Sequence, residues 1–170
     1  IVWRIALGSL KNKLVFLLPA LLALDHFLPQ AITPLLMLGG AYTYARVPLG
    51  FWLQELMALD RNPYDKIGHF MQGFVPAIAA REILLRGAFV RGRRMLAFLV
   101  LCVVLAISAS YELIEWAAAL ALGQGADEFL GTQGDPWDTQ SDMFLALIGG
   151  SAALLLLSAL HDRQLARLVG

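Results

Sequence analysis

The chain contains 170 residues, of which 59% are hydrophobic and only 15% are charged, and its mean hydropathy is +0.68. Soluble domains are about half apolar and about a quarter charged, so this composition argues against a soluble domain and favours a protein of the lipid bilayer. Thirteen Lys and Arg residues balance 13 Asp and Glu residues, which argues against a nucleic-acid partner, because phosphate binding needs a basic face. A single cysteine, Cys102, excludes a disulfide framework and a thiolate metal cluster.

The first apolar segments are two candidate membrane spans, residues 14–27 and 31–47, separated by a Pro-Gln pair. Each approaches the shortest helix, about 17 residues, that crosses a hydrocarbon core. The first residue is Ile1 rather than Met, so we expect the natural N-terminus to lie further upstream. On that expectation, residues 1–7 would be the end of a sixth helix.

The segment 50–60 is amphipathic and carries Trp52, a pattern typical of a helix that lies at the membrane surface. The remaining apolar segments predict three more spans, at residues 67–85, 95–122 and 144–160. We therefore predict an all-α fold, a polytopic transmembrane bundle of about five helices with one short interfacial helix. The whole chain, residues 1–170, is predicted to be a single integral-membrane domain.

The distribution of charge predicts an orientation. The connection 86–94 contains four arginines and no acid, so we expect it on the cytoplasmic side, together with the C-terminal segment 161–167. The connection 123–142 contains five acids and no basic residue, and we expect it to face outward. The arginine connection is also expected to contact anionic lipids. Near the same end, Arg81 and Glu82 are expected to pair with each other or to snorkel towards water.

Three of the predicted spans carry ionisable side chains at one depth. At a rise of about 1.5 Å per residue, His69 and Glu112 lie about 26 Å from the cytoplasmic ends of their spans, and Asp142 lies about 28 Å away. This depth is close to the outer edge of a hydrocarbon core about 30 Å thick. A carboxylate there is costly unless it is paired, protonated or metal-bound. Lys66, Arg46 and a divalent cation are the candidate partners of the glutamates in this layer.

Helical spacing brings further groups into this layer, because Asp65 lies four residues before His69 and Glu115 lies three residues after Glu112. The candidate acid–base groups are Asp65, His69, Glu112, Glu115 and Asp142. All of these except Glu115 are also candidate ligands of a divalent cation, since carboxylates suit hard cations and an imidazole suits zinc. The alternative is an interhelical hydrogen-bond cluster that only fixes the packing of the helices.

The turn-rich, acidic segment 131–140 precedes the last span. Its side chains Gln133, Asp135 and Asp138 would bind a ligand if this segment closes over the polar layer as a lid. The alternative is a turn that ends the loop, with Asp138 as the N-cap of the last helix. Tyr42 and Tyr44, at the outer end of the second span, are either aromatics of the membrane interface or ligand contacts, and Tyr42 is the candidate ligand-binding residue of the two.

Several longer strings of residues carry a family resemblance, namely YTYARVP (42–48), DRNPYDKIGHF (60–70), YELIEW (111–116) and GTQGDPWDTQSDM (131–143). With these strings the chain resembles the YjdF-like family of bacterial inner-membrane proteins, whose function is not established. The resemblance implies an inner-membrane location, six helices, and a histidine at the position of Ala41. The family is more distantly similar to the VanZ-like membrane proteins, which share the motif that here runs from Asp65 to His69.

Two functions of different classes fit these patterns. The first is an outward-facing site within the membrane that acts on a lipid or lipid-linked headgroup, with a divalent cation or with acid–base groups. The second is an accessory subunit of a larger membrane complex, in which the polar layer serves internal packing alone. The expected partners are therefore membrane lipids and, on the second hypothesis, a larger membrane protein complex.

Overall fold

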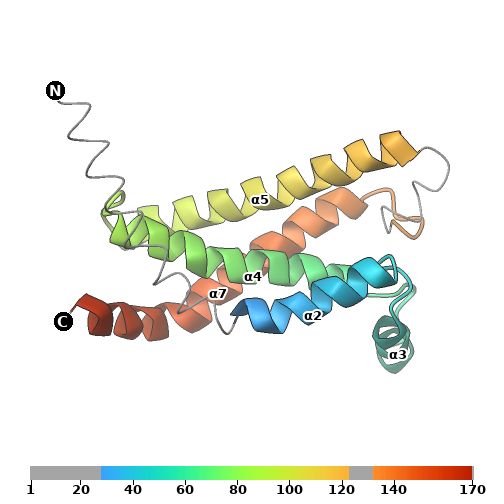
Figure 1. Ribbon diagram of the computed structural model, residues 1–170, viewed down its shortest axis with the longest axis horizontal. Coiled ribbons are helices and arrows are strands. Elements are labelled where there is room, and N and C mark those ends of the chain that lie inside the picture. Colours follow the sequence, from blue (N-terminus) through green and yellow to red (C-terminus); the bar gives the residue numbers. More distant parts are fainter. Residues whose placement is uncertain (1–27, 123–131, 170) are drawn as a thin grey trace.

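The computed structural model describes residues 28–122 and 132–169 (Figure 1). Within these residues the structure is helical and contains no strand, which confirms the all-α prediction. The helices are α2 (Leu28–Ala41), α3 (Pro48–Met57), α4 (Tyr64–Arg86), α5 (Arg93–Leu122) and α7 (Asp138–Val169). The predicted span 14–27 and the predicted helix end 1–7 lie outside the described residues.

Helix α2 differs from the predicted span 31–47. It ends at Ala41, because Thr43 and Tyr44 adopt left-handed backbone conformations with φ of 58° and 49°, which a right-handed helix cannot contain. At its other end, Pro29 was expected to separate two spans but lies in the first described turn of α2.

Helices α4, α5 and α7 form the body of the molecule and run in alternating directions, while α2 lies beside α4 (Figure 1). Small and branched apolar side chains fill the space between the three long helices. Those that are fully buried include Ala77, Ile78, Val100, Val104, Ala146 and Ala153. Helix α3 lies at the end of the bundle where α2 ends and α4 begins, and Figure 1 shows it nearly end-on.

Helices α4 and α7 make backbone-to-backbone contact near their middles. A Cβ atom added to Gly73 would overlap the carbonyl group of Ala146, and one added to Gly149 would overlap the carbonyl group of Phe70. Only glycine permits this approach, which is the way that small residues pack membrane helices together.

Two helices are long and apolar enough to cross a membrane, over Arg93–Ala121 and Asp138–Ala166, each with a mean hydropathy of 2.3. In the most apolar 18-residue stretch of each helix, only 17% and 22% of the residues are buried. The core helix of a soluble protein is mostly buried instead. Large apolar side chains such as Phe98, Trp116 and Leu155 point outward instead. This inverted pattern fits a lipid surrounding. The count of five spans stays a prediction.

Candidate functional site

Three helices bring the five predicted acid–base groups to one place, which we call the carboxylate–histidine cluster (Asp65 and His69 of α4, Glu112 and Glu115 of α5, and Asp142 of α7). His69 lies at its centre. Its Nε2 atom is 3.5 Å from Asp65 Oδ1 and 3.7 Å from Asp142 Oδ2, and its Nδ1 atom is 3.7 Å from Glu112 Oε1. Candidate ligand atoms lie within 4.8 Å of one another in two overlapping groups that share His69.

The side chains of this cluster are removed from solvent. The exposed fractions are 8% for Asp65, 5% for His69, 9% for Glu112 and 3% for Asp142. Two carboxylate oxygens, Asp65 Oδ2 and Glu112 Oε1, are buried and have no hydrogen-bond partner within the part of the chain that the structure describes. A buried polar atom without a partner costs about 1–3 kcal/mol, and more when it is charged.

Lys66 contacts the start of α7. Its Nζ atom donates to Asp138 Oδ1 and to Asp142 Oδ1, each at 2.9 Å, and to the hydroxyl of Ser141. Arg61, just before α4, adds a second cation at 2.6 Å from Asp138 Oδ1. The contacts of Lys66 are thus with aspartates of α7, whereas the sequence suggested it as a partner of the glutamates of α5.

Two of the three loop side chains that would form a lid over the layer contact the segment before α4 instead. The side-chain amide of Gln133 accepts from the Asn62 N–H and donates to the Asn62 carbonyl, each at 3.1 Å. Asp135 lies 3.4 Å from Arg61. These bonds fasten the loop to the segment that precedes α4. Among the three predicted ligand-binding residues of this loop, the structure links Asp138 to the cluster, through Lys66.

A pocket of about 290 Å³ opens beside the cluster. Its polar wall contains Tyr44, Asp65, His69, Gln72 and Tyr111, and its apolar wall contains Met71, Val75 and Pro76. We call it the tyrosine pocket. The ring of Tyr111 packs edge-on against His69 at a centroid distance of 5.9 Å, and its hydroxyl is hydrogen-bonded to Tyr44.

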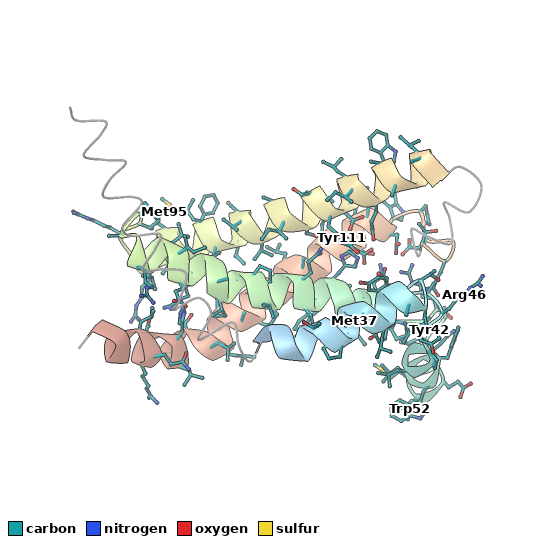
Figure 2. The ribbon with its side chains drawn as sticks, viewed as in Figure 1. Met37, Tyr42, Arg46, Trp52, Met95 and Tyr111 are labelled. Carbon is teal, nitrogen blue, oxygen red and sulfur yellow. The ribbon has the colours of Figure 1, made fainter. Side chains whose placement is uncertain are left out.

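Tyr42, the tyrosine selected from the sequence, is 46% exposed and does not line this pocket. In Figure 2, Tyr111 lies between the helices and Tyr42 lies near α3. The position of Tyr111, directly before Glu112 and four residues before Glu115, is a sequence signal that identifies it as a member of the site. Tyr44 carries no such signal. It reaches the pocket because the chain makes a left-handed turn at this point, which helical spacing does not predict.

A second group of charged side chains, the arginine–histidine cluster, joins α4 to α7 at the opposite end of the bundle. Arg81 bonds His161 Nδ1 at 2.8 Å and Asp162 at 2.6 Å, and Glu82 lies 3.1 Å from Arg86 and 3.4 Å from His161. Arg81 is 6% exposed and Glu82 is 0% exposed. Of the two alternatives expected from the sequence, ion pairing or snorkelling, the structure shows ion pairing, with partners from α7 and with Arg86 rather than between Arg81 and Glu82.

Comparison with known proteins places the chain in a family. Residues 13–163 match the family described as "Predicted membrane protein (DUF2238)". The inner membrane protein YjdF of Escherichia coli (strain K12) is 68% identical over 133 residues, which cover 78% of this chain and 64% of that relative. This chain therefore matches less than two thirds of the length of that relative.

No solved structure matches the chain. The relative confirms the YjdF-like resemblance and supports a location in the bacterial inner membrane. The more distant similarity to VanZ-like proteins finds no support here and stays a prediction. On the match over residues 13–163, the chain belongs to the DUF2238 family of predicted membrane proteins.

Proposed function

We propose that the carboxylate–histidine cluster binds a divalent cation and that the tyrosine pocket binds the headgroup of a membrane lipid beside it. The observation that carries the proposal is the pair of buried oxygens, Asp65 Oδ2 and Glu112 Oε1, that have no hydrogen-bond partner in the described residues. Both belong to carboxylates that face His69. A cation would complete the coordination of these oxygens and offset the cost of their burial.

The balance of charge around the cluster supports the same conclusion. The cluster contains four carboxylates around one imidazole, whereas the neighbouring cation, Lys66, divides its contacts between Asp142 and Asp138. A membrane interior disfavours such an excess of negative charge. Carboxylate oxygens combined with one imidazole nitrogen suit Mn²⁺ or Zn²⁺ better than Mg²⁺ or Ca²⁺, which prefer oxygen ligands alone.

The shape of the tyrosine pocket supports a lipid as the second ligand. Its lining extends along α4 from Asp65 to Pro76, a distance of about 17 Å at the rise of an α-helix. Half of a hydrocarbon core measures about 15 Å, so the pocket extends for about the depth of one leaflet. Polar groups line one part, and Met71 and Val75 line another. This arrangement suits a headgroup at the cluster and an acyl chain along α4.

The proposed lipid belongs to the outer leaflet, because the arginine connection 86–94 assigns the other end of the bundle to the cytoplasm. Two single cysteines in a Cys102→Ala background test this orientation. We expect a membrane-impermeant maleimide to label Gln140→Cys in intact spheroplasts, and to label Ala88→Cys only after the membrane is permeabilised. The reverse pattern would place the site in the inner leaflet and would refute this part of the proposal.

Metal binding to the whole chain in lipid nanodiscs tests the cation. After treatment with a chelator, we expect the protein to take up one equivalent of Mn²⁺ or Zn²⁺, measured by calorimetry and by elemental analysis. Asp65→Asn and Glu112→Gln should each weaken this binding by at least about tenfold, because each removes a charged ligand. The matched control is Glu55→Gln, which neutralises an exposed carboxylate of α3 outside the cluster.

Two results would contradict the proposal. The first is wild-type protein that takes up no stoichiometric metal. The second is equal affinity in the cluster variants and in Glu55→Gln. If Asp65→Asn and Glu112→Gln change only the thermal stability of the protein, the cluster serves helix packing, as in the alternative interpretation of the sequence.

A further inference from the structure

A second cavity, of about 390 Å³, lies at the opposite end of the bundle from the carboxylate–histidine cluster. The end of α4, the beginning of α5 and the C-terminal part of α7 meet there, and Figure 2 shows charged side chains at this end near Met95. Its charged lining residues are Arg81, Arg93 and Asp162, and its apolar wall includes Leu96, Ala97, Leu154 and Leu155. Nothing in the proposed cation site uses these residues.

The charge at this end favours an anionic ligand. Residues 81–94 and 161–163, which lie at this end of the described structure, contain six arginines and two carboxylates (Arg81, Arg86, Arg91, Arg93, Arg94, Arg163; Glu82, Asp162). Arg93 is also the first residue of α5, so the positive end of the helix dipole lies beside the cavity.

The two lining arginines differ in how they are held. The guanidinium of Arg81 is fixed by its bonds to His161 and Asp162 and is almost entirely buried. A planar guanidinium has five N–H groups, so these two bonds leave donors for a further acceptor. Arg93 is exposed at the mouth of the cavity. The cavity thus combines one preorganised cation with one accessible cation, an arrangement that suits a phosphate group.

The apolar wall distinguishes a lipid from a soluble phosphate compound. Leu154 and Leu155 of α7 line the cavity, and Leu155 is 85% exposed on the same apolar surface as Leu156. Water around such a surface is unfavourable, whereas lipid chains would cover it. A ligand with both a phosphate and acyl chains satisfies both parts of the cavity.

We propose that this cavity is a binding site for an anionic phospholipid, whose phosphate contacts Arg81 and Arg93 and whose acyl chain lies against the α7 leucines. The ligand belongs to the leaflet at the arginine-rich end. The negative charge of Asp162 repels the phosphate only weakly, because Asp162 is paired with Arg81 at 2.6 Å. The site is independent of the proposed cation site at the other end of the bundle.

Native mass spectrometry of the whole chain, released from nanodiscs of equal parts phosphatidylglycerol and phosphatidylcholine, tests the proposal. We expect wild-type protein to retain one phosphatidylglycerol in preference to phosphatidylcholine. Arg93→Gln should reduce this retention about fivefold, which corresponds to the loss of one basic group near an anionic lipid. Arg94→Gln is the matched control, because it removes the same charge from the neighbouring residue, which does not line the cavity.

A second variant distinguishes lipid bound in the cavity from lipid attracted to the charged surface of the protein in general. Ala97→Phe adds no charge but fills part of the cavity, and it should also reduce the retained phosphatidylglycerol. Metal uptake by the carboxylate–histidine cluster should be unchanged in Arg93→Gln and in Ala97→Phe. The proposal for the cation site and the proposal for the lipid site can therefore fail separately. Equal loss of lipid in Arg93→Gln and Arg94→Gln, or equal retention of both lipids by wild-type protein, would overturn the site. Displacement of the bound lipid by millimolar inorganic phosphate would identify a soluble phosphate site instead.

Discussion

Replacement of Lys66 by methionine is expected to lower the free energy of unfolding by about 3–5 kcal/mol, since it leaves the buried carboxylate of Asp142 without its lysine, while Asp138 keeps the guanidinium of Arg61. The Nζ atom of Lys66 lies 2.9 Å from both Asp138 Oδ1 and Asp142 Oδ1, whose side chains are 6% and 3% exposed. Titration of the folded chain in detergent with sodium dodecyl sulfate, followed by circular dichroism, measures the change.

Two further variants test whether the loss of stability comes from the missing charge of Lys66. Lys66→Arg keeps the charge and should lose much less stability than the methionine variant. Asp142→Asn in the Lys66→Met background should recover part of the loss, because it removes the carboxylate charge that the loss of Lys66 leaves uncompensated. A loss below about 1 kcal/mol for Lys66→Met, the range of a surface ion pair, would show that the aspartates at the start of α7 are not held by this lysine.

Replacement of Glu82 by leucine is expected to have an effect of similar size, again about 3–5 kcal/mol, because one partner is removed from a buried charged group. Glu82 is 0% exposed and accepts from Arg86, with His161 at 3.4 Å. Its loss leaves His161 and Arg81 together without a nearby buried anion. The same detergent titration measures the change in stability.

The control for this experiment is Glu82→Gln, which has the same shape and an amide oxygen that can still accept from Arg86. We expect the glutamine variant to retain more stability than the leucine variant. If both variants unfold at the wild-type detergent concentration, the charge of Glu82 does not hold α4 to α7. The ion pairs of the arginine–histidine cluster would then contribute as little to stability as ion pairs at a protein surface.

The carboxylate–histidine cluster was predictable because helices have a regular rise and regular faces. Counting residues from the arginine-rich ends was enough to place His69, Glu112 and Asp142 at one level, and the structure brings them together. Spacing within each helix added Asp65 and Glu115. These inferences need only the period of one helix at a time, which is what a sequence encodes most directly.

Features that depend on a turn or on a distant partner were not predictable. The site takes Tyr44 rather than Tyr42 because Thr43 and Tyr44 leave the helical conformation, and neither is a glycine that would indicate such a turn. Arg81 was expected to pair or to snorkel, but the sequence did not identify its partners, because His161 and Asp162 lie about 80 residues away in the chain. The contacts of Gln133 depend on a distant partner in the same way, since its side chain bonds to the backbone of Asn62.

The glycine contact between α4 and α7 has a consequence for how a ligand enters. These two helices are joined at three heights, by Lys66 and Asp142, by Gly73 against the Ala146 carbonyl, and by Arg81 and Asp162. Sliding or rotation of α7 against α4 would break all three at once. Helix α5 shares ionic and apolar contacts with this pair, but a Cβ atom added to Gly150 would meet only side chains of α5, those of Val104 and Leu101, and no backbone atom. If the proposed lipid needs the tyrosine pocket to widen, α5 is therefore the helix expected to move against the α4–α7 pair, and a crosslink between α4 and α5 should block binding.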